Sequence, residues 1–121
     1  MIFKNEAKFI MRDGNVKLTE GLTYYSDRYD FDIYVPEAFV SDQASVPDFV
    51  PAFIVNDTGR ITYPSIVHDY LYESGGLDGA VPKYVADIIF YDAMRERGMP
   101  RWRASIAYLA VKFFGRYREV Y

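Results

Sequence analysis

The sequence predicts an α+β fold in which a small N-terminal antiparallel β-sheet is followed by a long ordered connection and three C-terminal helices. In residues 1–40, short segments alternate between apolar and polar side chains, which is typical of strands. In residues 63–121, apolar side chains recur at intervals of three and four, which is typical of helices. The length of 121 residues and the hydrophobic content of 50% predict a single domain over residues 1–121.

The first predicted element pair is a β-hairpin. Residues 7–11 and 16–19 flank Asp13-Gly14, and an Asp-Gly pair is a strong signal for a tight turn between two strands. Two further strands are predicted at residues 22–25 and 31–35. The last one alternates apolar with polar side chains and should end at the proline that follows it, because proline cannot donate a hydrogen bond to a sheet.

Residues 41–62 are predicted to be an ordered connection that wraps the core. Pro47 and Pro51 disfavour a helix there. The segment is also too rich in Val, Ile and Phe for a solvated loop. Residues 56–59, Asn-Asp-Thr-Gly, are predicted to form a turn.

Three helices are predicted at residues 64–73, 82–97 and 100–117, each opened by a proline. Proline suits the first turn of a helix because the N–H group that it lacks would have no partner there. Gly98 stands where a helix-ending glycine is expected. Helical rows are visible in the second helix at Tyr84, Ile88, Tyr91 and Arg95, and in the third at Trp102, Ile106, Leu109 and Phe113.

Composition excludes several kinds of site. The chain has no cysteine, which rules out disulfides, thiolate nucleophiles and Cys-ligated zinc, and its single histidine rules out a multi-histidine metal site. The net charge of −3 does not favour nucleic acid, and the arginines of the last third are attributed to solvated helix ends. The longest apolar stretch is too short to cross a bilayer, and no signal peptide is expected at the N-terminus.

The one imidazole, His68, is the leading candidate for chemistry. Ser65, His68 and Tyr72 share one face of the first predicted helix, whereas Asp69 lies on the adjoining face. A histidine can act as a general base near neutral pH when another group orients its second nitrogen. Asp69 is poorly placed for that task, because sequence neighbours on a helix do not face each other.

Asp87 is the better candidate for orienting the imidazole. It lies within the second predicted helix among aromatic neighbours, where a carboxylate needs partners. If the first two helices pack antiparallel, Asp87 can face His68, with Tyr72 hydrogen-bonding nearby. Asp69 would then point into solvent or toward a cation.

Several alternatives stay open for these residues. His68 could be a core histidine in a buried polar network that only specifies packing. Asp87 could pair with Lys83, Arg60 or Arg103. Asp42 and Ser45 could line the cleft at His68, although a capped turn before an extended segment is the favoured interpretation of residues 42–47.

Four motifs together resemble a phage- and prophage-encoded family of unknown function, numbered one-three-five-three among such domains. They are residues 41–47 (Ser-Asp-Gln-Ala-Ser-Val-Pro), 68–72 (His-Asp-Tyr-Leu-Tyr), 86–90 (Ala-Asp-Ile-Ile-Phe) and 108–115, which end in Phe-Gly. The match covers residues 40–115. The chain departs from the family pattern at Asp48, where a basic or aromatic residue is common, and at Lys83, where arginine is common.

The His-Asp-x-x-Tyr motif with a second-helix aspartate also resembles the core of the small secreted phospholipases A-two. This resemblance implies His68 as the base for a water, Asp69 as a calcium ligand, Asp87 as the orienting group and Tyr72 as its partner. The chain lacks the disulfides and the glycine-rich calcium loop of those enzymes. Calcium takes six to eight oxygen ligands, and Asp69 supplies at most two. Asp42, Asp48 or Asp57 from the connection could contribute others, although nothing in the sequence requires it.

The expected function is that of a phage or prophage accessory or virion-associated protein that binds a phage structural or host protein. The resemblance to the phage family and the 12 tyrosines, a residue type common at interfaces, favour this role. It would place the protein in the host cytoplasm or the virion. The alternative is a calcium-assisted, phospholipase A-two-like ester hydrolase that acts on lipid through a His68–Asp87 dyad.

Overall fold

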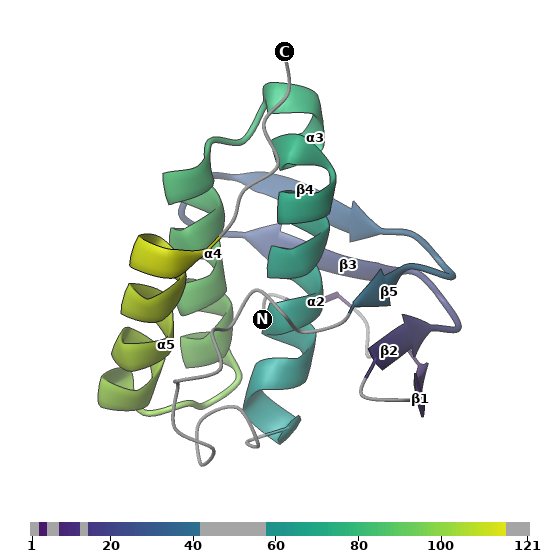
Figure 1. The fold of residues 1–121 in the computed structure, drawn as a ribbon, viewed down its shortest axis with the longest axis horizontal. Coiled ribbons are helices and arrows are strands. Elements are labelled where there is room, and N and C mark those ends of the chain that lie inside the picture. Colours follow the sequence, from purple (N-terminus) through teal and green to yellow (C-terminus); the bar gives the residue numbers. More distant parts are fainter. Residues whose placement is uncertain (1–2, 5–7, 13–14, 42–57, 116–121) are drawn as a thin grey trace.

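The computed structural model describes residues 3–4, 8–12, 15–41 and 58–115. These residues form an α+β fold, as predicted. Two small antiparallel sheets lie beside a group of helices, and the β3–β4 hairpin crosses behind the helices α2 and α4 (Figure 1).

The predicted N-terminal hairpin is confirmed. Strands β1 (Phe9–Arg12) and β2 (Asn15–Leu18) pair antiparallel, with Phe9 opposite Leu18. The turn residues Asp13-Gly14 lie outside the described residues. The sheet gains a third strand, β5 (Val40–Ser41), which pairs with β2 and lies where the predicted connection begins.

The second sheet is the hairpin of β3 (Leu22–Ser26) and β4 (Phe31–Val35). Both strands alternate as the sequence predicts, because every second side chain points toward the helices. Ile33 and Val35 are fully buried, whereas Asp32 and Tyr34 are exposed.

The described residues after β5 form four helices, namely α2 (Thr58–Glu73), the short α3 (Gly75–Gly79), α4 (Lys83–Glu96) and α5 (Arg101–Phe114). The last two begin directly after Pro82 and Pro100, as expected. Gly98 adopts a φ of +95° after α4, a conformation that favours glycine, so its helix-ending role is confirmed.

The prediction that Pro64 opens the first helix is wrong, because α2 begins at Thr58 and Pro64 lies inside it. Thr58 and Gly59, predicted as part of a turn, are helical. Within a helix Pro64 offers no N–H to the carbonyl of Arg60. Burial of Ile61, which is only 1% exposed, favours the extension despite that loss.

Helix α4 lies between α2 and α5 and contacts both, while α2 also contacts β4 and β5. The colours of Figure 1 show that α2 and α4 run in opposite directions, which is the antiparallel packing expected for His68 and Asp87 to meet. One buried cluster joins the sheets to α2 and α4, and a second joins α2, α4 and α5.

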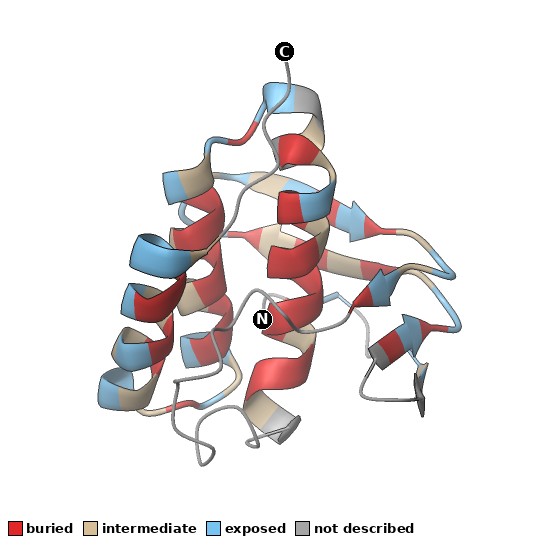
Figure 2. Cartoon of the chain, viewed as in Figure 1, coloured by how far each residue is buried: buried red, intermediate tan, exposed pale blue. Residues whose placement is uncertain are grey.

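Helix α5 packs through its small side chains. Ala104, Ala107, Ala110 and Val111 are buried, while the predicted row at positions 102, 106, 109 and 113 is exposed (Figure 2). The helical spacing of that row is confirmed, but the row faces away from the core. None of the described helices is both long enough and apolar enough to cross a membrane.

Candidate functional site

The site forms where α2 and α4 face each other. His68 from α2 and Asp87 from α4 are both buried, with 0% and 1% of their surfaces exposed. The distance from His68 Nε2 to Asp87 Oδ1 is 2.8 Å, within the range of a hydrogen bond. The structure therefore brings together the two residues predicted as base and orienting group.

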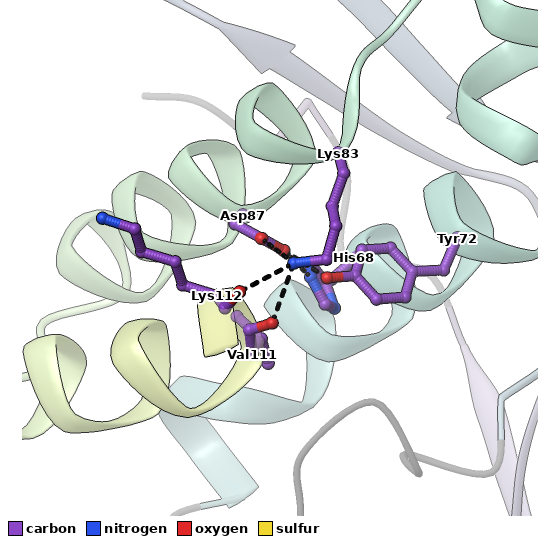
Figure 3. A network of polar contacts seen from close by, with 6 residues as sticks. All are labelled: His68, Tyr72, Lys83, Asp87, Val111 and Lys112. Carbon is purple, nitrogen blue, oxygen red and sulfur yellow. Dashed lines mark hydrogen bonds and ion pairs between the residues drawn. The ribbon is translucent and has the colours of Figure 1, made fainter. Parts of the chain in front are cut away.

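Asp87 also accepts hydrogen bonds from two other side chains (Figure 3). The Tyr72 hydroxyl donates to Oδ1, the oxygen that contacts His68. Lys83 Nζ donates to Oδ2 over 2.7 Å, one helical turn away. The pairing with Lys83 that the sequence offered as an alternative thus coexists with the contact to His68, because a carboxylate has two oxygens that can each accept several bonds.

These contacts fix the protonation states of the pair. Burial by itself would raise the pKa of Asp87, but hydrogen bonds from His68, Lys83 and Tyr72 outweigh it and hold that pKa below its usual value. Burial lowers the pKa of His68, although its bond to Asp87 opposes the shift. At neutral pH a neutral imidazole therefore donates from Nε2 to a charged carboxylate, and Nδ1 carries a lone pair.

The Nδ1 atom of His68 is buried and has no hydrogen-bond partner among the residues that the structure describes. The imidazole contacts the rings of Tyr72 and Phe90, with centroids 4.1 and 4.6 Å from its own. Both rings fix the plane of the imidazole by packing. A buried polar atom without a partner is uncommon in folded proteins and calls for a physical explanation.

A family model described as "Protein of unknown function (DUF1353)" matches residues 16–111. The chain belongs to this family. The DUF1353 match runs from β2 into α5 and includes His68, Tyr72, Lys83 and Asp87. Comparisons with curated proteins and with solved structures found no match, so the likeness to phospholipases A-two stays a prediction made from the motif.

The prediction that Asp69 points into solvent is wrong for this DUF1353 chain. Asp69 is 6% exposed and accepts a hydrogen bond of 2.8 Å from Ser41 Oγ in β5. The bond ties α2 to the edge of the first sheet, because β5, which the sequence analysis missed, brings Ser41 to this point.

The described residues do not fit a calcium site at Asp69. They contain no cluster of three or more acidic or histidine side chains that could hold a metal ion. Asp69 and Ser41 offer far fewer oxygens than the six to eight that calcium takes. Asp42 and Ser45, the predicted cleft-lining residues, lie outside the described residues.

The sequence analysis also missed a second role of Lys83. Its Nζ donates to the carbonyl oxygens of Val111 over 3.0 Å and of Lys112 over 3.1 Å, in the last turn of α5, where helix carbonyls run short of partners within the helix. The i, i+4 spacing of Lys83 and Asp87 indicated their pairing, but nothing in the sequence places the end of α5 beside them. One side chain therefore connects the dyad to a third helix.

Proposed function

We propose that this DUF1353 chain is a hydrolase in which His68 takes a proton from a water molecule that attacks an acyl ester. The observation that carries the proposal is the state of Nδ1. It is the basic end of an oriented, neutral imidazole and has no partner among the described residues. A histidine oriented by a carboxylate is the usual arrangement of a general base.

A purely structural network is the competing interpretation, and it accounts less well for this atom. Networks that specify packing gain stability when every member is satisfied. Asp87 here receives three hydrogen bonds, and Lys83 has three acceptors. The unsatisfied atom is the nitrogen that a general base would use, and a network selected for packing alone has no reason to leave it so.

The chemistry assigns a role to each side chain. As Nδ1 takes the proton from water, the water oxygen bonds to the acyl carbon and the imidazole becomes positive, a charge that the adjacent Asp87 carboxylate stabilises. The ester C–O bond then breaks, and the imidazolium returns the proton to the departing alcohol oxygen. Tyr72 and Lys83 act as positioning residues, because they hold Asp87 charged and in place. The imidazole has no exposed surface, so substrate reaches Nδ1 only when the site opens.

The first prediction concerns turnover of a soluble acyl ester and of phospholipid by purified protein. Replacing His68 with Asn or Asp87 with Asn should lower kcat/KM by about 10²–10⁴-fold, the usual contribution of general-base catalysis. Tyr72→Phe should lower it less, since two donors to Asp87 remain.

Tyr24→Phe is the matched control for Tyr72→Phe. This substitution also removes a buried tyrosine hydroxyl that donates to a carboxylate, here Glu96 over 2.9 Å. The bond lies away from the dyad. The variant should keep full turnover even if it lowers the melting temperature. Unchanged turnover in His68→Asn, with the protein folded, would refute the hydrolase.

A binding role is the second candidate, favoured by the nine large hydrophobic side chains that are exposed among the described residues. In that role the protein would bind a phage structural or host protein, as the sequence analysis expects. Full biological activity of the His68→Asn variant in a strain that lacks the wild-type gene would favour binding over hydrolysis.

A further inference from the structure

The outer face of α5 carries a continuous row of large apolar side chains. Trp102, Ile106, Leu109 and Phe113 follow one another at helical spacing and are 38–67% exposed. We call these four residues the α5 row. Single exposed apolar side chains are ordinary, but a contiguous row marks an interaction site.

Helix α5 buries small side chains and exposes large ones, which is the reverse of what core packing alone favours. Its inward face consists of Ala104, Ala107, Ala110 and Val111, on the side of the helix opposite the row. A helix held only by core packing would gain more by burying its large side chains, at about 25 cal/mol per Å² of apolar surface. Here the large side chains are presented outward and the small ones let α5 approach α4 closely.

The charged side chains of α5 have one sign. The helix carries three basic residues, Arg101, Arg103 and Lys112, and no acidic one, while the whole chain has 14 basic and 17 acidic residues. On the helix, Arg101 and Lys112 lie along one flank of the row and Arg103 along the other. In a protein of net charge −3, the row therefore lies on a helix whose charged side chains are all positive.

The cations and aromatic rings of this face also contact one another. The Arg103 guanidinium lies 5.2 Å from the Trp102 ring centroid, and Lys112 Nζ lies 5.5 Å from that of Phe113. An apolar and aromatic row between cationic flanks is the pattern of helices that lie in the interface of an anionic bilayer. Negative lipid headgroups attract the cations, while tryptophan and phenylalanine enter the headgroup region.

We infer that the α5 row binds an anionic lipid surface. A second copy of the chain fits less well, because a two-fold contact would bring two positive faces together. The inference does not depend on hydrolysis, since none of the row belongs to the dyad.

The chain contains its own probe, because Trp102 is the only tryptophan and lies in the row. Purified protein is titrated with vesicles of phosphatidylcholine with or without phosphatidylglycerol, at low and high salt, and fluorescence and co-sedimentation are measured. Phosphatidylglycerol vesicles should bind the protein and shift Trp102 emission to the blue. Binding should weaken as salt rises, because the attraction is partly ionic.

The double variant Leu109→Asp/Phe113→Asp should bind these vesicles at least about tenfold more weakly, because it places negative charge in the apolar row. Val40→Asp/Tyr34→Asp is the matched control, since both residues are exposed apolar or aromatic side chains on the strands, and it should bind like the wild type. His68→Asn should also bind normally, which separates this inference from the proposed hydrolase.

Three outcomes would overturn the inference. The first is no binding to phosphatidylglycerol vesicles, and the second is equal binding by wild type and the Leu109→Asp/Phe113→Asp variant. The third is a dimer in sedimentation that this variant abolishes while vesicle binding is absent, which would assign the row to a second copy.

Discussion

At the scale of single residues, the site is organised around a buried carboxylate. Asp87 has 1% of its surface exposed, and burying a charge without partners would be costly. Donors from Tyr72, Lys83 and His68 offset that cost and keep the group ionised. The negative charge then holds the imidazole in the tautomer with its proton on Nε2, so the chemistry available at Nδ1 follows from the surroundings of Asp87.

The shifted pKa values predict how stability changes with pH. Burial lowers the pKa of His68 below its usual 6.5, so in acid the unfolded chain takes up a proton before the folded chain does. The stability that His68 contributes is therefore present above pH 6.5 and is lost as the pH falls below it. Glu96 acts in the opposite direction, because partial burial, together with the nearby carboxylates of Asp92 and Asp27, raises its pKa from 4.5 to about 7. Its contribution is lost as the pH rises from 4.5 to 7.

Urea unfolding of His68→Asn and Glu96→Gln between pH 4.5 and 7 separates these two effects. Without His68, the free energy of unfolding should fall more steeply with rising pH than in the wild type, because the Glu96 effect is no longer opposed. Glu96→Gln should change the slope in the opposite direction. Parallel curves for His68→Asn and the wild type would show that burial does not shift the pKa of His68.

At the scale of secondary-structure elements, α5 has one closely packed face and one exposed face. Ala107 is fully buried against the second cluster, whereas Leu109, two residues later, is 47% exposed. Lys83 holds the last turn of the helix by its carbonyls. The helix is thus fastened at one end and along its small-residue face, which leaves the other face for contacts outside the domain.

Size changes on the two faces of α5 should have unequal effects on stability. Ala107→Leu should lower the free energy of unfolding by about 1–3 kcal/mol, because added methylenes have no room in a packed core. Leu109→Ala should change it by about 0.5 kcal/mol or less, as is usual for surface substitutions. Thermal or urea unfolding measures both, and a larger loss in Leu109→Ala would mean that the α5 row contributes to the core.

At the scale of the whole molecule, two side-chain links fasten the β3–β4 hairpin to α4. Arg28 binds Asp92 through Nε and Nη2, each over 2.8 Å, and Tyr24 donates to Glu96 over 2.9 Å. A two-point contact between arginine and a carboxylate is stronger and more directional than a single ion pair. These links connect the sheet side of the protein to the helix that carries Asp87.

Removing the arginine link should cost more than removing an ordinary surface pair. Arg28→Ala should lower the free energy of unfolding by about 1 kcal/mol, since Asp92 is only 15% exposed and loses both bonds. Lys4→Ala breaks an ion pair with Asp32 in which both side chains are about half exposed, and it should cost less than about 0.5 kcal/mol. Equal costs in unfolding experiments would show that the two-point contact does not fasten the hairpin.

The sequence by itself determined the α+β class, the first hairpin and the starts of α4 and α5. Those features depend on local chemistry, namely side-chain periodicity, an Asp-Gly turn signal and prolines at helix starts. It also identified His68, Tyr72 and Asp87 as partners, because helical spacing and one antiparallel packing sufficed to bring them together. Local signals failed at Pro64, where burial of the preceding residues carries α2 through a proline.

Only the tertiary structure decided which face of each element is covered. Helical spacing shows that the residues of the α5 row share one face of the helix. It cannot show that this face is exposed while Ala104 and Ala107 pack against the core. The bond from Ser41 to Asp69 and the contacts from Lys83 to the end of α5 join residues 28 or more apart in sequence. Such contacts depend on how distant elements pack, which no short-range pattern in the sequence encodes.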